Sequence, residues 1–187
     1  MFVMVARIVS GSPRPPHGCE RTHEAGPVRV RVWIRQHGGV TSLDVTIGGE
    51  GDDSITITIL GRMHPGATDY WDGNWLLSPT TISVGDFTGR IGGGLRCDEL
   101  QQFRVELESL NATLSGAAQL SSMEGWVDVR MIGDGLGHVA VSGSLMDEPG
   151  VGNRLEFTFD IDQTFLPGII KSLVDVAQSF PVLGSPR

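Results

Sequence analysis

The chain of 187 residues contains only two cysteines, Cys19 and Cys97. Cys19 lies in a proline-rich stretch and Cys97 lies beside a predicted helix start, so we do not expect a disulfide framework. Unpaired thiols are typical of proteins that work in a reducing compartment. The sequence therefore favours a cytoplasmic protein.

Long apolar runs are also missing, because no stretch approaches the roughly 18 residues that a transmembrane helix requires. Residues 1–9 resemble a secretory signal only loosely, since they lack a basic leading segment and Arg7 interrupts the apolar residues. We therefore expect no membrane partner.

Basic residues become scarce after the first part of the chain. Residues 1–37 carry six arginines and two glutamates, whereas residues 38–187 carry eight basic and twenty acidic residues, within a net charge of −8. Phosphate binding needs clustered lysines and arginines, so this balance argues against nucleic acid as a partner. It is compatible with a basic protein partner, although solubility alone also explains it.

Recognisable catalytic motifs are absent as well. None of the five histidines has a carboxylate or thiol at a metal-binding spacing, and no Gly-x-Ser-x-Gly elbow occurs. The glycine-rich residues 133–137 precede a strand-like run, so they predict a hairpin turn and not a phosphate loop. We therefore expect no catalytic residue, metal or cofactor.

Two groups of residues leave a chemical role open. Asp160 and Asp162 lie two residues apart and could act as paired acids, although a strand end with a helix cap is the favoured interpretation. His64 lies near Asp69 and Asp72 in a predicted loop, where it could act as a base. The sequence offers no nucleophile to complete such a site.

The fold class follows from the hydrophobic periodicity. Residues 1–26 are rich in proline and glycine and predict a disordered tail, which leaves residues 27–187 as a single β-rich domain. Alternating apolar and polar residues predict strands. These strands are expected at residues 28–35, 43–47, 55–59, 75–84, 86–91, 117–124 continuing into 125–132, 136–146 and 153–161.

Two helices interrupt and end this series of strands. The first is expected to begin with Asp98 as its cap and Gln101 at the third helical position, followed by leucines and a phenylalanine at helical spacing. The second spans about 164–180, with Pro167 in its first turn. The sequence thus predicts an α+β fold, mainly β, with an antiparallel sheet or sandwich of about eight strands, one inserted helix and one C-terminal helix.

The most unusual stretch is residues 69–76, which hold the only tyrosine and two of the four tryptophans. One interpretation is that it anchors a long loop to the sheet, and the other is that exposed aromatic edges contact a partner. The candidate residues for either role are Tyr70, Trp71, Asp72, Asn74 and Trp75.

The stretch from Tyr70 to Leu76 resembles the Tyr-Asp-x-Asn-Trp-Leu signature of WapI-type bacterial immunity proteins, although the extra Trp71 departs from the common form. The resemblance extends over about residues 54–182, through spaced agreement that includes a helix opening at Asp98 and a closing helix that ends before Pro181. Characterised members are small cytoplasmic proteins that neutralise the toxic nuclease domain of a bacterial toxin.

The resemblance implies a non-enzymatic inhibitor that binds a cognate toxin domain. Acidic loops could then imitate the phosphates of a nuclease substrate, through Glu50, Asp52, Asp53, Asp147 and Glu148. Two alternatives remain open: an interaction domain with no toxin, and a small hydrolase or ligand-binding protein that uses His64, Asp69 and Asp72. The sequence gives no indication of oligomeric state.

Overall fold

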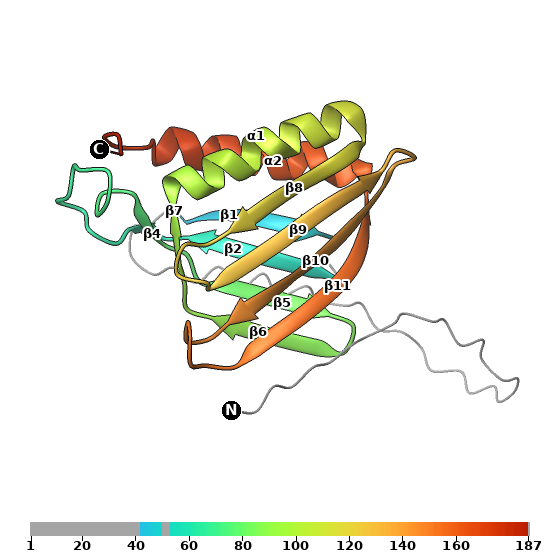
Figure 1. Ribbon diagram of the computed structural model, residues 1–187, viewed down its shortest axis with the longest axis horizontal. Coiled ribbons are helices and arrows are strands. Elements are labelled where there is room, and N and C mark those ends of the chain that lie inside the picture. The colour runs from blue at the N-terminus through green and yellow to red at the C-terminus, as the bar shows by residue number, and fades with distance from the viewer. Residues whose placement is uncertain (1–41, 50–52, 187) are drawn as a thin grey trace, which may run out of the picture.

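The computed structural model describes residues 42–49 and 53–186 (Figure 1). The predicted tail, the strand expected at residues 28–35, and the acidic candidates Glu50 and Asp52 lie outside the described residues. Within these ranges the chain forms eleven strands, two α-helices and one short 3₁₀ helix.

The chain repeats one arrangement twice, a four-stranded antiparallel sheet followed by a helix. The first sheet has the order β1-β2-β5-β6, and the second has the order β11-β10-β9-β8. The first half consists of β1 (Leu43–Gly48), β2 (Ser54–Ile59), β5 (Thr80–Val84), β6 (Phe87–Ile91) and α1 (Cys97–Thr113). The second half consists of β8 (Ser115–Ser121), β9 (Val127–Asp134), β10 (His138–Met146), β11 (Arg154–Asp162), the 3₁₀ helix Gln163–Phe165 and α2 (Leu166–Ser179).

The two sheets lie one in front of the other, and both helices cover the same side of the pair (Figure 1). Helix α1 packs on β8, α2 packs on β1, and the two helices pack on each other, while β5 contacts β11. The core is formed by the inward residues of both sheets, such as Ile57 and Val129, and by helix residues such as Phe103 and Leu173. The arrangement is therefore a sandwich, not a single curved sheet.

This architecture confirms the predicted α+β, mainly β class with one inserted and one C-terminal helix. The described residues contain eleven strands where about eight were expected, because two of the expected strands are divided and two short strands were not expected. Three short strands form an additional sheet. These are β3 (Gly61–Arg62), β4 (Trp75–Leu77) and β7 (Gly94–Arg96), in the order β3-β4-β7.

Two predicted strands are divided in the structure. Residues 75–84 split at Ser78 and Pro79, where Ser78 N–H bonds the carbonyl of Gly93 (2.9 Å) and proline has no N–H to continue a ladder. Residues 117–132 split at a turn in which the Ser122 hydroxyl accepts from Val127 N–H (3.0 Å). Glu124 lies exposed in that turn.

The helix boundaries differ slightly from expectation. Helix α1 is capped by Arg96, and Glu99 is the third helical residue, whose carboxylate accepts from Arg96 N–H (2.8 Å), so the predicted Asp98 cap was wrong by two residues. At the other helix, Asp162 accepts from Thr164 N–H (2.9 Å), as the helix-cap interpretation predicted, and Pro167 lies in the first turn of α2.

Candidate functional site

The candidate site is the loop between β3 and β4, which projects from one end of the sandwich beside the C-terminus (Figure 1). At its base lies Arg96, whose side chain is only 1% exposed. Its guanidinium donates to the carbonyls of Trp71 (2.8 Å) and Tyr70 (2.9 Å), and its Nε bonds Asp98 (3.1 Å). A buried charge requires such partners, and here the loop backbone supplies two of them.

Three aromatic rings surround the same guanidinium. Its central carbon lies 4.9 Å from the ring centroid of Tyr70, 5.4 Å from that of Trp75 and 5.6 Å from that of Trp71. The Tyr70 and Trp71 rings meet edge to face, with centroids 5.3 Å apart. Arg96 therefore organises the whole aromatic stretch through hydrogen bonds and cation–π contacts.

Arg96 was not among the residues that sequence reasoning singled out. It comes two residues after three consecutive glycines that mark a break in the strand pattern, and it lies 20 residues beyond the end of the aromatic stretch. The sequence feature that could have indicated Arg96 is its position between a glycine break and a predicted helix start, two residues before Asp98. Only the pairing of β4 with β7, which places Trp75 opposite Arg96, brings the two segments together.

Asn74 links this loop to the end of the chain. Its side chain is fully buried, and its amide nitrogen donates to the carbonyls of Tyr70 (2.8 Å) and Leu183 (2.9 Å). Its side-chain oxygen accepts from Leu183 N–H (2.8 Å), and its backbone carbonyl accepts from Cys97 N–H (2.9 Å). The asparagine thus ties together the loop, the start of α1 and the C-terminal segment, residues 181–186.

Arg62 makes a second link to the C-terminal segment. Its guanidinium donates to the carbonyl of Pro181 (2.6 Å) and to the carbonyl of Gly73, and it also approaches the Cys97 sulfur (3.6 Å). Burial raises the pKa of the Cys97 thiol, which therefore has little thiolate character.

The residues of the hydrolase alternative all lie in this loop but do not form a catalytic arrangement. The Asp69 carboxylate accepts from the backbone N–H groups of Asp72 (2.9 Å) and Trp71 (2.8 Å), and these bonds lower its pKa. His64 and Asp72 are exposed. Among the described residues, no hydrogen bond joins His64 to either carboxylate.

Four apolar residues of the loop and the small sheet are exposed or half-buried, and we call them the aromatic patch: Met63, Trp71, Trp75 and Leu77. Exposure is 53% for Trp71, 44% for Leu77 and 36% for Met63, and Trp75 is half-buried. Trp75 and Leu77 lie on the same face of β4. Met63 and Trp75 close over Gly94, where an added Cβ would lie 2.9 Å from Met63 Cε and 3.4 Å from the Trp75 ring.

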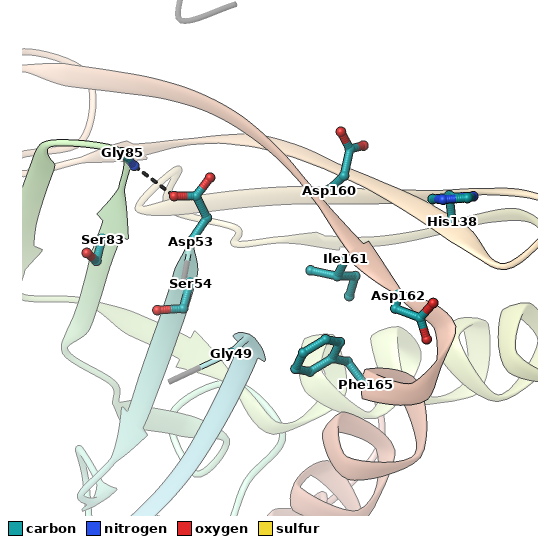
Figure 2. A pocket seen from close by; sticks show the side chains of 10 residues that line it. All are labelled: Gly49, Asp53, Ser54, Ser83, Gly85, His138, Asp160, Ile161, Asp162 and Phe165. Atoms are coloured by element: carbon teal, nitrogen blue, oxygen red, sulfur yellow. Dashed lines mark hydrogen bonds between the residues drawn. The ribbon is translucent and has the colours of Figure 1, made fainter. Parts of the chain in front are cut away.

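A second feature is a cleft of about 750 Å³ between the ends of the two large sheets (Figure 2). Ile161 and Phe165 point toward one another, whereas Asp160 points away from them (Figure 2). Asp53 accepts from Gly85 N–H (2.7 Å), and Asp162 caps the helix that follows it. The polar groups of the cleft do not converge, and among the residues that the structure describes no three metal-ligating side chains gather.

The acidic candidates that the structure describes, Asp53, Asp147 and Glu148, do not form one surface. Asp53 lies in the cleft near His138, at the start of β10, whereas Asp147 and Glu148 follow the end of β10. At about 3.3 Å per residue, the nine residues of that strand place Asp147 roughly 30 Å from His138. Asp147 accepts from the Asn153 side chain (2.9 Å) and backbone (2.7 Å), which lowers its pKa.

No helix within the described ranges is long and apolar enough to cross a membrane.

Three solved structures are similar to this chain at low sequence identity. Trypanosoma bruciei MRP1/MRP2 is 12% identical with a TM-score of 0.36, covering 75% of this chain and 88% of that one. The CdiA-CT/CdiI toxin and immunity complex from Enterobacter cloacae is 14% identical with a TM-score of 0.36, covering 73% of this chain and 98% of that one. The plant transcriptional regulator PBF-2 is 11% identical with a TM-score of 0.44, covering 78% of this chain and 84% of that one.

No curated protein sequence matches the chain. The sequence model of the immunity protein WapI-like family, in contrast, matches residues 46–181, which include both large sheets, both helices and the aromatic stretch. Because this match covers most of the chain, the protein belongs to the WapI-like immunity protein family.

Proposed function

We propose that this protein is an immunity protein, which binds a cognate bacterial toxin domain and neutralises it without catalysing a reaction. The observation that carries the proposal is the family match over residues 46–181. It covers the sandwich and the Arg96-centred loop together, so the proposal concerns the folded part of the chain and not an isolated motif.

The proposed mechanism is occlusion. A folded inhibitor that buries a toxin's active site or substrate channel needs shape and charge complementarity, and none of its side chains has to react. The net charge of −8 suits a basic toxin domain such as a nuclease, because opposite charges accelerate encounter. We further propose that this occurs in the cytoplasm, where a toxin that enters the cell would meet its inhibitor.

Co-expression tests the proposal. The C-terminal domain of any toxin encoded beside this gene would be expressed alone, with this protein, and with an unrelated acidic protein of similar size as the control. We expect survival only with this protein, and a complex of equal stoichiometry on co-purification. Growth arrest in all three cultures, or rescue without a complex, would contradict direct neutralisation.

The acidic side chains can be tested separately from the function itself. Asp147→Asn with Glu148→Gln removes two exposed charges at one end of the molecule, and Asp53→Asn removes one at the other end. If these carboxylates imitate substrate phosphates, each variant should release the toxin faster than the wild type does. Unchanged dissociation in both variants would rule out phosphate imitation and leave neutralisation intact.

A further inference from the structure

We propose that the aromatic patch formed by Met63, Trp71, Trp75 and Leu77 is the surface on which the toxin domain docks. The inference rests on the proposed immunity function and assigns it to a place on the molecule. The patch residues lie on β4 and on the loop between β3 and β4, which projects from one end of the sandwich (Figure 1), and Met63, Trp71 and Leu77 are exposed.

The composition of the patch is that of an interface centre. Tryptophan and methionine are enriched at the centres of protein interfaces, and truncation of a central tryptophan commonly produces a large loss of affinity. Soluble proteins normally scatter exposed apolar side chains singly, whereas Trp71, Met63 and Leu77 are exposed on one surface joined by Trp75.

The loop that presents Trp71 is already held in one conformation. Arg96 binds the carbonyls of Tyr70 and Trp71, Asn74 joins the loop to the C-terminal segment, and Asp69 binds two successive N–H groups. A preorganised surface loses little conformational freedom on binding, so more of the interaction energy appears as affinity. The Trp71 side chain is more than half exposed, yet this network holds the backbone that carries it in place.

Charge indicates the kind of occupant. The carboxylates of Asp69 and Asp72 are exposed on the same loop, and the lowered pKa of Asp69 keeps it ionised. Within the described residues, the two arginines bonded to this loop are not available to a partner, because Arg96 is buried and Arg62 is bound to backbone carbonyls. An apolar centre with a negative rim fits a basic protein surface that has an apolar pocket, and it disfavours nucleic acid.

Two other surfaces of the described residues lack such an anchor. The outer face of the first large sheet is lined by small hydroxyl side chains, including Thr56 and Thr81, and the cleft of Figure 2 has dispersed polar groups. A stable interface buries about 800 Å² on each partner, so the patch would form the centre of a larger contact.

The test uses the purified toxin domain identified by rescue, made catalytically inactive, and titration calorimetry. Trp71→Ala should weaken binding by about 30-fold or more, as expected for a central hot spot. Leu77→Lys should also weaken it, because it places a positive charge against a basic partner. Phe87→Ala and Val151→Ala, which truncate exposed apolar residues elsewhere, are matched controls and should bind within about twofold of wild type.

Thermal melts of every variant separate binding from folding. Trp71 is tied to Arg96 through its backbone carbonyl, so the Trp71→Ala variant keeps that bond and should melt close to the wild type. If wild type binds and both patch variants bind equally well, the docking surface is wrong and the immunity function stands. If the wild type does not bind the toxin domain, the proposed function and this inference both fail.

Discussion

At the scale of single residues, Tyr70 reports directly on the Arg96-centred cluster, because it is the only tyrosine in the chain. Its hydroxyl donates to Asp98 (2.7 Å), and this bond, followed by desolvation, raises its pKa above the ordinary value of 10.0. Above pH 10 the unfolded chain loses this proton while the folded chain keeps it, so stability should fall as pH rises from there to the folded pKa.

We predict that Asp98→Asn lowers the pKa of Tyr70, because the charged acceptor that favours the protonated hydroxyl is removed. Tyrosinate absorbance, followed as a function of pH under native conditions, measures this directly with no other tyrosine to interfere. The same titration of Glu108→Gln, on the exposed face of α1, serves as the control and should match the wild type. An unshifted titration for Asp98→Asn would mean that the hydrogen bond does not set the pKa.

Asn74 is the second residue on which the cluster depends. We predict that Asn74→Ala lowers the free energy of unfolding by about 2–3 kcal/mol, since three buried hydrogen bonds lose their partner at once. Urea denaturation measures the change. Asn111→Ala, on α1, is the matched control and should be near neutral, because alanine favours a helix. Equal stability of both variants would show that Asn74 is not a structural link.

At the scale of elements, β10 depends on a glycine in its inward row. Gly143 pairs with Val129 and Phe157, and a Cβ added to it would lie 2.0 Å from the carbonyl oxygen of Asp128 and 2.9 Å from the Phe157 ring. A backbone carbonyl cannot move aside as a flexible side chain can. The strand therefore passes its neighbour at a distance that only glycine allows.

We predict that Gly143→Ala destabilises the protein by about 3 kcal/mol, because overpacking here involves backbone atoms. Gly89→Ala, in β6, is the control, since its added Cβ would meet Ile82 at 3.4 Å and Leu155 at 3.9 Å, which are ordinary contacts. Thermal unfolding followed by circular dichroism compares the two. A Gly143→Ala protein that melts with the wild type would contradict the close approach.

Elements with strong periodicity could be predicted from the sequence, and those fixed by tertiary contacts could not. Strands such as residues 55–59 alternate strictly, and the apolar stripe of α1 repeats at helical spacing, so both were assigned correctly. Strands β3 and β7 have two and three residues, too few for any period to appear, and β4 was expected only as the start of a longer strand. For the same reason the pairing of β4 with β7, which places Arg96 opposite Trp75, could not be inferred. The aromatic stretch itself was evident from the sequence.

At the scale of the whole molecule, acidic residues are dispersed. Asp53 lines the cleft with His138 at the start of β10, Asp147 follows the end of β10, and Asp69 and Asp72 lie on the loop between β3 and β4. Such a distribution creates a broad negative potential over the surface. It does not create one local cluster of charges that would resemble a phosphate backbone. Its effect on a basic toxin should therefore appear in the association rate, while short-range contacts at the aromatic patch should determine the dissociation rate.

Stopped-flow binding at increasing salt separates these two effects. Between roughly 0.05 and 0.5 M salt we expect the association rate with the toxin domain to fall about tenfold or more, while the dissociation rate changes little. Asp147→Asn with Glu148→Gln should slow association modestly and leave dissociation unchanged, whereas Trp71→Ala should accelerate dissociation and leave the salt dependence intact. An association rate that is independent of salt would mean that the charge serves solubility alone, because steering by a net charge cannot survive screening.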